Sequence, residues 1–333
     1  MYGDYELNAH AVLKYAWTYD FFRTFHSIIY RQIEVPTVML RAFHHFIRNQ
    51  VDVHMASDLF VRRAKTANRL FSISDLQKVL YRPPRPVRDL SRVLHRKALL
   101  MPGSLYLFAL KHFPRQRIIF LISDKSDVKA VRGRKMPANF DVIDYRKALK
   151  RTAVSPKITA KIVRKCKQIA KSESNHPVFS RPEFVPWFCK KIGKVLRQIK
   201  LCDLILKKHP IQLIVHHNEL DAPGSILALL SSKYRLPFLF VQMHMLSDES
   251  VTPAKASKYF VWGEQYRKWF EQKGIESQNI YEIGSLSFEN ISRQKYTSAS
   301  KLRKALGIPD HFRIIAWTTQ SFPTQVNFLL IKW

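Results

Sequence analysis

The sequence predicts an α/β fold in which a Rossmann-like parallel sheet follows a helical N-terminal region. Three short apolar runs, Ile211–Val215, Phe238–Val241 and Lys258–Trp262, each end in polar or glycine-containing residues. A helical segment separates the first two runs, and another, Glu264–Gly274, leads into a fourth strand at Asn279–Ile283. Apolar strands that alternate with helices are typical of a parallel sheet covered on both faces.

The helical region is expected to span residues 1–112. Apolar residues recur there at spacings of three and four, as in Phe21, Phe25 and Ile28, and such stripes usually face a core. The segment Tyr81–Lys97 begins with prolines and continues as a predicted basic amphipathic helix. It is interpreted either as a solvated linker with a surface helix or as a patch for anionic lipid headgroups.

The sheet domain is expected to span residues 113–300. Arg117–Ile122 is its predicted opening strand, and a weaker strand follows at Phe140–Ile143. Helices are predicted at Ser155–Lys171 and Glu183–Lys208, each with apolar residues on one face and Lys and Arg on the other.

Residues 301–333 are expected to begin a second α/β domain. A short helix, Lys301–Leu306, stops at Gly307, and a strand is predicted at Arg313–Ala316. Only this first strand of the second domain is recognised in the sequence. The chain is therefore interpreted as a truncated copy of a larger protein.

The composition limits the classes of protein to which the chain can belong. Of its 333 residues, 46% are hydrophobic and 12% aromatic, which is enough for a packed core and excludes a disordered tail. Lys and Arg outnumber Asp and Glu by 56 to 25, and the formal net charge of +31 attracts polyanions such as nucleic acid, anionic membranes and phosphate-rich substrates. Neither the dinucleotide-binding nor the P-loop glycine motif occurs.

Cysteine usage and apolar runs bear on localisation. Cys166, Cys189 and Cys202 form no C-x-x-C pair and fall on the apolar faces of predicted helices, so they are expected to be buried free thiols. The N-terminus has no secretory pattern, and the longest apolar run, Ala98–Leu110, is shorter than the about 18 residues of a membrane span. These observations predict a cytoplasmic protein, with basic helices that favour the inner face of the cell membrane.

The candidate site residues follow the predicted strands. Ligands of open α/β sheets bind at the carboxyl ends of the strands, so the side chains at those ends are selected. They are His216, His217, Asn218, Glu219, Asp221, His244, Gly263, Glu264, Gly284 and Ser285.

The order and spacing of these turns resemble a known family. A strand is followed by Asn218-x-x-Asp221, then by Pro237–Gln242, by Trp262-Gly263-Glu264 and by Ile283-Gly284-Ser285. This series resembles the first domain of the two-domain GT-B glycosyltransferases of bacterial surface-polymer synthesis, including capsule, teichoic-acid and CDP-glycerol-type transferases. The resemblance covers residues 200–290 and extends more weakly to about residue 115. Where that family has His-Gly after the glutamine, this chain has Met243-His244.

The resemblance implies a transferase that requires neither a cofactor nor a metal. Its donor is a nucleotide-activated sugar or CDP-glycerol, and its acceptor is a polyanionic polymer or a lipid-linked chain of the cell envelope. Glu219, Asp221 and His244 are the implied catalytic residues, because the acceptor hydroxyl must give its proton to a base. The implied substrate-binding residues are His217, Asn218, Gly263, Glu264, Gly284 and Ser285, with Thr318, Thr319 and Gln320 at a donor diphosphate.

Simpler interpretations of the same residues stay open. Asn218 and Asp221 are also preferred helix caps, and the two glycine-containing turns also suit ordinary strand ends. The histidines are alternatively structural, or they share a zinc ion, although their spacing fits no standard zinc motif. For the whole chain, the alternatives are a non-catalytic remnant and a basic nucleic-acid-binding protein. Because no zinc-finger, RNP or basic-zipper motif occurs, no specific nucleic-acid partner is expected.

Overall fold

The structure is a computed structural model in which residues 1–288 and 289–333 form two compact units. It describes residues 7–93, 95, 97–246, 251–286, 297–309, 311 and 312. In the second unit, α14 (Ala299–Leu306) ends at Gly307, which adopts the left-handed conformation expected of a helix stop. The predicted strand Arg313–Ala316 lies outside the described residues, as do Thr318, Thr319 and Gln320.

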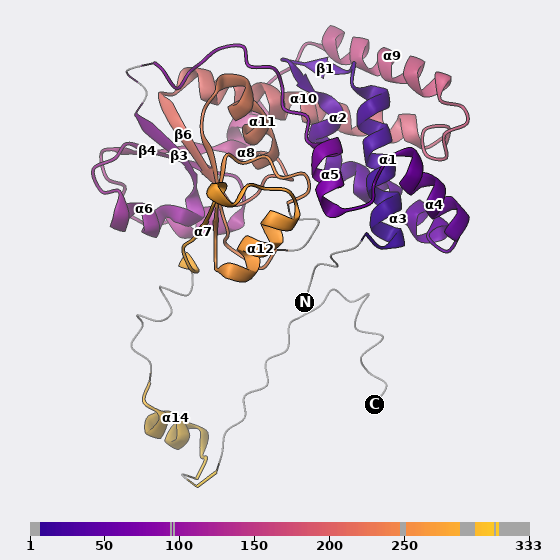
Figure 1. Cartoon of the computed structure of the whole chain (residues 1–333). Coiled ribbons are helices and arrows are strands. Elements are labelled where there is room, and N and C mark those ends of the chain that lie inside the picture. Colours follow the sequence, from indigo (N-terminus) through magenta and orange to yellow (C-terminus); the bar gives the residue numbers. More distant parts are fainter. Residues whose placement is uncertain are drawn as a thin grey trace. The chain divides into compact units, whose positions relative to one another are not determined.

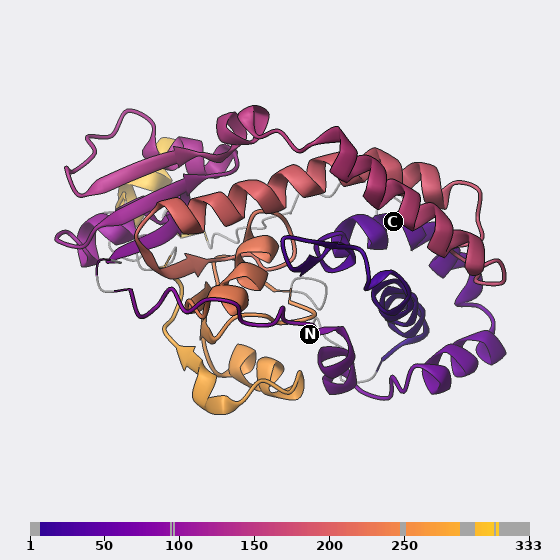
Figure 2. The same cartoon turned by 90° about the horizontal axis from the view of Figure 1, so that it is seen from above.

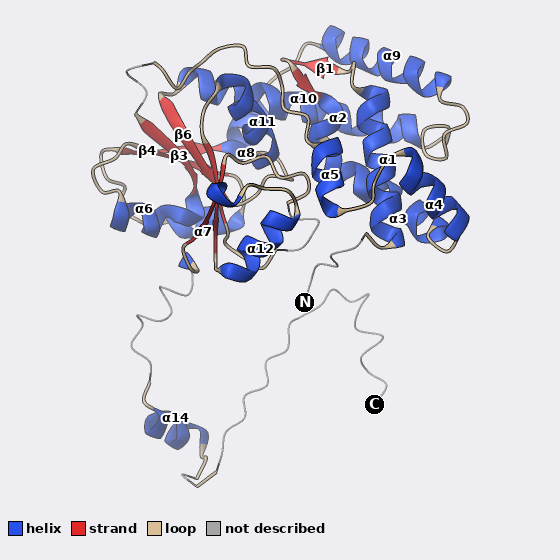
Figure 3. Ribbon diagram, in the orientation of Figure 1, coloured by secondary structure: helices blue, strands red, loops and turns tan. Residues whose placement is uncertain are grey.

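A seven-stranded parallel sheet forms the centre of the first unit as far as it is described (Figure 3). Its strands are β3 (Ala98–Pro102), β4 (Ile118–Ile122), β5 (Phe140–Asp144), β6 (Ile211–His216), β7 (Phe238–Val241), β8 (Lys258–Val261) and β9 (Ile280–Glu282). The spatial order is β5-β4-β3-β6-β7-β8-β9, and every neighbouring pair is parallel. This is the doubly wound Rossmann order, so the predicted fold class is confirmed.

The central strand β3 differs from the sequence prediction. The expectation that Arg117–Ile122 opens the sheet is wrong, because β3 precedes it and pairs with both β4 and β6. All five residues of β3 are buried. Alanine, leucine and methionine are good helix formers, so propensity alone did not reveal a strand at Ala98–Pro102, and burial on both faces of the sheet decides its conformation.

Helices cover both faces of the sheet. Those that follow β3 are α6 (Tyr106–His112), α7 (Lys125–Val131), α8 (Tyr145–Arg151), α9 (Pro156–Ser172), α10 (Phe184–Lys208), α11 (Gly224–Tyr234) and α12 (Glu264–Gln272), with single 3-10 turns at Gly103–Leu105 and Ser277–Asn279. Leu99 and Met101 of β3 pack with Tyr106 of α6, whereas Leu100 packs in the cluster that contains α10 and α11. Successive side chains of a strand point to opposite faces of the sheet, which explains why neighbouring residues of β3 pack in different clusters.

The N-terminal region is helical up to residue 80, apart from one short hairpin (Figure 1). Its elements are α1 (Ala9–Phe25), β1 (Ile29–Tyr30), β2 (Ile33–Glu34), α2 (Val35–Val38), α3 (Leu40–His54), α4 (Asp58–Ala67) and α5 (Ile73–Leu80). The rings of Phe21 on α1 and Phe43 on α3 stack with their centroids 4.3 Å apart. The predicted apolar stripe of Phe21, Phe25 and Ile28 is fully buried.

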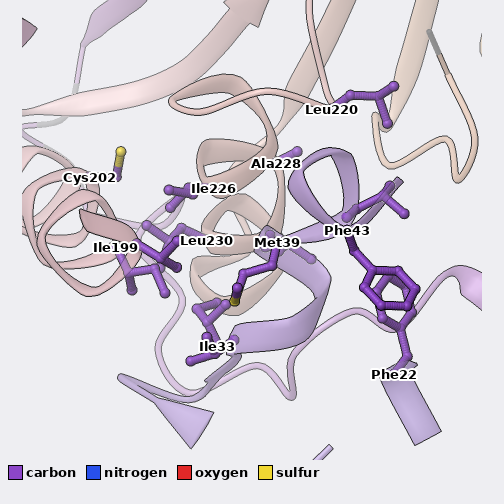
Figure 4. Close-up of a cluster of buried hydrophobic side chains, with 14 of the residues drawn as sticks. Phe22, Ile33, Met39, Phe43, Ile199, Cys202, Leu220, Ile226, Ala228 and Leu230 are labelled. Atoms are coloured by element: carbon purple, nitrogen blue, oxygen red, sulfur yellow. The ribbon is translucent and has the colours of Figure 1, made fainter. Parts of the chain in front are cut away.

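One hydrophobic core joins these helices to the sheet. Figure 4 shows Phe22 and Phe43 of the N-terminal helices in the same cluster as Ile199 of α10 and Ile226 of α11. The helical region is therefore packed against the sheet domain, and the position of the N-terminal helices is set by buried apolar contacts.

The predicted basic helix within Tyr81–Lys97 does not form in residues 81–93. This segment is extended, and the backbone amides of Val87 and Leu90 donate to the carbonyls of Lys233 and Tyr234 at the end of α11. Prolines 83, 84 and 86 favour an extended backbone in the residues before them, and the amides of Val87 and Leu90 pair with α11 in place of helical acceptors. Leu90 is buried, so the segment is a strap across α11.

A buried carboxylate ties the hairpin to α10 and α11. Asp203 is fully buried, and its oxygens accept from Arg31, Lys207, Lys233 and the Tyr234 hydroxyl. Burial raises the pKa of Asp203, but the Tyr234 hydrogen bond and the Lys233 charge outweigh it and hold the pKa below its usual range. The negative charge of the buried carboxylate is therefore balanced by three basic side chains and stabilised by the hydroxyl hydrogen bond.

Two long basic helices lie side by side along one flank of the unit, α9 and α10 (Figure 2). Lys157, Lys161, Arg164 and Lys171 are exposed on α9, as the sequence pattern predicts. Cys166 and Cys202 are buried, Cys189 is partly buried, and all three are free thiols. Among the described residues, no helix is long and apolar enough to cross a bilayer.

Candidate functional site

The carboxyl edge of the sheet has a topological switch point between β3 and β6. The chain leaves β3 through Gly103 and Ser104 and leaves β6 through His217, and the two connections run to opposite sides of the sheet. Such a point leaves a crevice in which ligands of open α/β sheets bind. We use the name switch-point rim for Ser104, Ser123, Asp124, Asp127, His217 and His244.

Asp127 holds the loops after β3 and β4 together. Its buried carboxylate accepts from the backbone amide of Ser104 at 2.9 Å and from the amide and hydroxyl of Ser123 at 2.9 and 3.1 Å. Gly103 permits this approach, because a Cβ at that position would lie 3.0 Å from Asp127 and 2.5 Å from the Ile122 side chain. One side of the rim is therefore fixed in place.

Asp124 places a negative charge beside His217. It caps α7, and its Oδ1 accepts from the Asp127 amide at 2.9 Å and from the Ser126 hydroxyl at 2.7 Å. Burial raises the pKa of Asp124, but these hydrogen bonds and the nearby His217 lower it by more. The net pKa therefore lies below its usual value. Asp124 is therefore a carboxylate at neutral pH.

His217 is the centre of the rim. Its Nδ1 and the Ser104 Oγ are both buried and have no hydrogen-bond partner among the described residues. Burial lowers the pKa of His217, while Asp127 and Asp124 oppose the shift and His244 adds to it. The net pKa is below 6.5, so the imidazole is neutral at pH 7 and able to accept a proton.

His244 approaches His217 from the neighbouring strand end. The two ring centroids are 6.4 Å apart and the rings are nearly perpendicular. Gln242 fixes this turn, because its amide donates to the His244 carbonyl at 3.1 Å and accepts from the Trp262 backbone at 2.9 Å. The predicted convergence of His217 and His244 is thus present, and His244 is exposed to solvent.

His216 and Asn218 build the turn that presents His217. Nδ1 of buried His216 accepts from the Asn218 amide at 3.0 Å, and burial lowers the pKa of His216 to about 3. The Asn218 side chain accepts from the amides of Leu220 and Asp221 at 2.8 and 2.9 Å. These contacts fit the structural interpretation, with Asn218 as the cap of the turn.

Glu219 is entirely buried beneath the edge of the sheet. Its Oε2 accepts from the Lys255 amide at 2.6 Å, and Lys255 Nζ donates to the Glu219 carbonyl at 2.7 Å. Burial raises the pKa of Glu219 and lowers that of Lys255, and their mutual attraction opposes both shifts. A substrate hydroxyl does not reach this carboxyl group in the described conformation, so its observed contacts are structural.

Asp221 contacts α3 of the N-terminal helices. Its Oδ1 lies 3.3 Å from Arg41 Nε, and its Oδ2 accepts from the Asn218 side chain at 3.2 Å. The side chains of Arg41 and Asp221 are both about half exposed. Asp221 therefore links the β6–α11 loop to α3 through a solvent-accessible ion pair.

The remaining predicted residues follow β8 and β9 on the same edge. Gly263 is the N-cap of α12, and a Cβ there would meet only open space. Glu264 is exposed in the first turn and pairs with Lys268 at 2.7 Å. Gly284 adopts a left-handed conformation with φ of +74°, directly before Ser285.

The sequence located the edge but not the whole rim. The loops after β6, β7, β8 and β9 lie along a common edge, as predicted. Ser104, Ser123, Asp124 and Asp127 were missed. Ser123-Asp124 directly follows a predicted strand, so the same strand-end rule could have selected it, whereas Ser104 depended on recognising β3.

No group of three or more His, Cys, Asp or Glu side chains within the described ranges is arranged to hold a metal ion. No protein-family model and no curated protein matches the chain. The functional argument therefore depends on the fold and on the geometry of the site.

Proposed function

We propose that the chain is a GT-B-type transferase of cell-envelope polymer synthesis, and that its switch-point rim binds the acceptor. The observation that carries the proposal is the neutral, partly buried His217 at the switch point of a Rossmann sheet, beside two carboxylates and a second histidine. The donor is a nucleotide-activated sugar or CDP-glycerol. The acceptor is a lipid-linked or polymeric hydroxyl compound.

In the proposed reaction, His217 removes the proton from the acceptor hydroxyl. The acceptor oxygen forms a bond to the transferred sugar carbon, or to phosphorus if the group is glycerophosphate, and the bond to the nucleotide phosphate breaks. The nucleotide leaves with the bonding electrons, and the proton stays on the imidazole. Asp124 stabilises the resulting imidazolium by its negative charge.

The other rim residues position the reactants. Exposed His244, whose ring centroid lies 6.4 Å from that of His217, contacts the acceptor from the end of β7. The buried Ser104 hydroxyl and the clamp formed by Asp127 hold the β3 loop against the acceptor. Glu219, which the sequence implied as a base, instead anchors the turn, and Asp221 orients it through Arg41.

The basic helices favour an anionic partner. Lys157, Lys161, Arg164 and Lys171 share the solvent face of α9. Each basic residue near an anionic membrane contributes about 1 kcal/mol of attraction, which falls as salt is added. We infer that α9 keeps the protein near anionic lipid or a polyanionic product.

A transfer assay tests the proposed function. The chain is incubated with radiolabelled UDP-sugars or CDP-glycerol and with a membrane fraction that supplies acceptors, and label in polymer or lipid is measured. Replacing His217 by Gln removes the base and is expected to reduce the rate about 100-fold or more. The control is His112→Gln at the exposed end of α6, which is expected to leave the rate unchanged.

Two results would contradict the proposal. One is full transfer by the His217→Gln variant, which places the base elsewhere. The other is no label transfer by the wild-type chain with any of these donors. Base-selective, tight binding of nucleic acid at about 0.15 M salt would instead support the nucleic-acid alternative.

A further inference from the structure

A basic cavity lies on the N-terminal helices, apart from the switch-point rim. Its volume is about 320 Å³, near the lower end of the range for small-molecule sites. We define the basic pocket by its lining residues, which are His10, Lys14, Arg41, His44, His45, Arg48, Val51 and Leu220. Six of these eight side chains carry a basic nitrogen, and none is a carboxylate.

Helical spacing brings the basic groups together. Arg41, His44, His45 and Arg48 follow the i, i+3, i+4, i+7 pattern on α3, and His10 and Lys14 are one turn apart on α1. The fixed positive charges of the set are those of Lys14, Arg41 and Arg48, and residues 41–48 of α3 include no acidic residue to balance the two arginines. The apolar residues of α3, such as Phe43 and Ile47, are buried in the core instead. The pocket thus occupies a face that core packing does not require.

The first turn of each of the two helices contributes a residue to the pocket lining. His10 lies in the first turn of α1 and Arg41 in the first turn of α3, and neither first turn contains an acidic residue. Helix N-termini carry partial positive charge and favour anions, whereas cations there are unfavourable. An anion in the pocket is attracted by these first turns and by the positive charges of Arg41 and Arg48.

Several lining groups are held in place. His44 Nε2 lies 2.9 Å from the Thr18 hydroxyl, and its ring meets the Tyr15 ring edge-on. Lys14 is only 7% exposed, with Nζ 4.7 Å from the centroid of the Tyr15 ring. Arg41 Nε lies 3.3 Å from a carboxylate oxygen of Asp221, which leaves the arginine side chain about half exposed. A preorganised basic cavity of this kind binds an anion with little ordering cost.

We propose that the basic pocket is a binding site for a phosphate or diphosphate group. Arginine and lysine form charge-assisted hydrogen bonds to phosphoryl oxygens, and the small volume fits such a group on a sugar, a nucleoside or a lipid. The proposal goes beyond the transfer reaction and does not depend on it. A chain without transferase activity still binds the anion.

Calorimetric titration of the full chain with inorganic pyrophosphate, at about 0.15 M salt, tests the proposal. The Arg41→Gln/Arg48→Gln variant is expected to bind about 10-fold more weakly or worse, because two charge-assisted contacts are lost. Arg62→Gln/Arg63→Gln on α4 is the matched control, since it removes the same charge from exposed positions outside the pocket. This control is expected to keep its affinity.

Two further arms distinguish the source of the phosphate. CDP tests a free nucleotide, and vesicles containing phosphatidylglycerol test a lipid headgroup; the arm with the greater loss in the Arg41→Gln/Arg48→Gln variant identifies the source. Imidazole resonances of His10, His44 and His45 in the wild-type chain are expected to shift with pyrophosphate, which keeps the test valid if the variant unfolds. Unshifted resonances, absent binding of pyrophosphate, or equal loss in both double variants would overturn the proposal.

Discussion

The β6–α11 loop contributes to two polar regions that differ in their electrostatics. At the switch-point rim, His217 is neutral and partly buried beside Asp124 and Asp127. At the basic pocket, to which the loop contributes Leu220, the lining residues that the structure describes include Lys14, Arg41 and Arg48 and no carboxylate. The rim therefore suits proton transfer and the pocket suits anion binding, so one loop supports two chemical tasks.

The two regions share one anchor, Glu219, whose removal is expected to have the largest effect. Glu219→Ala leaves the buried Lys255 amide without its acceptor and removes the carboxylate that attracts Lys255 Nζ, which costs about 3 kcal/mol of unfolding free energy. Urea denaturation measures this loss, and both pyrophosphate binding and transfer are expected to weaken with it. Glu264→Ala is the control, because it removes only an exposed ion pair and is expected to leave the stability nearly unchanged. Equal losses for the two variants would contradict the anchoring role.

Gly224 is the second point that both regions share. A Cβ at Gly224 would lie 1.9 Å from the Asn218 carbonyl oxygen, so Gly224→Ala must displace the loop. The expected cost is about 1–3 kcal/mol, as for other overpacked sites. Gly193→Ala on α10 is the matched control, since its Cβ meets no atom within 4 Å and it is expected to stabilise the helix by about 0.5–1 kcal/mol. Thermal unfolding of the two variants should therefore shift in opposite directions.

The pH dependence of transfer tests the role of His217 at the rim. Protonated His217 cannot accept a proton, and its pKa is lowered by burial, so activity is expected to fall only below pH 6.5. Asp124→Asn removes a charge that raises the pKa of His217, and the midpoint of this acid limb should move to lower pH. The measurement is the rate between pH 5 and 8. A midpoint that moves upward contradicts the assigned base.

Asp221 is expected to have the smallest effect. Asp221→Asn removes a negative charge near the pocket while keeping a polar side chain next to Arg41. Exposed ion pairs contribute about 1 kcal/mol or less, so pyrophosphate binding should tighten only about twofold and stability should change little. Calorimetry of this variant checks the sign. Weaker binding would show that the carboxylate orients Arg41 for the anion.

Patterns of apolar strands predicted most of the sheet, but they could not identify its centre. The strands after residue 200 were recognised because their Val, Ile and Phe residues stand between polar turns. β3 was missed because its Ala-Leu-Leu-Met run has helix-forming residues and is defined only by its pairing with β4 and β6. The rim was incomplete for the same reason, since Ser104 follows β3.

Side-chain roles were harder to predict than side-chain positions. Glu219 follows β6, at a position where a catalytic carboxylate is expected, yet the sequence does not show that it turns inward to the Lys255 backbone amide. The basic pocket was also missed, although Arg41, His44, His45 and Arg48 stand at helical spacing. Basic residues at helical spacing are also typical of an ordinary solvated helix face, so their pattern alone does not indicate a cavity.

The separation of the rim from the pocket is tested most directly by a crossed measurement. Transfer rate and pyrophosphate affinity are measured for His217→Gln and for Arg41→Gln/Arg48→Gln. We expect His217→Gln to lose transfer about 100-fold or more while it binds pyrophosphate normally, and the arginine variant to lose pyrophosphate affinity about 10-fold. Loss of pyrophosphate binding in a folded His217→Gln variant would contradict the account, because the two regions would then be one site.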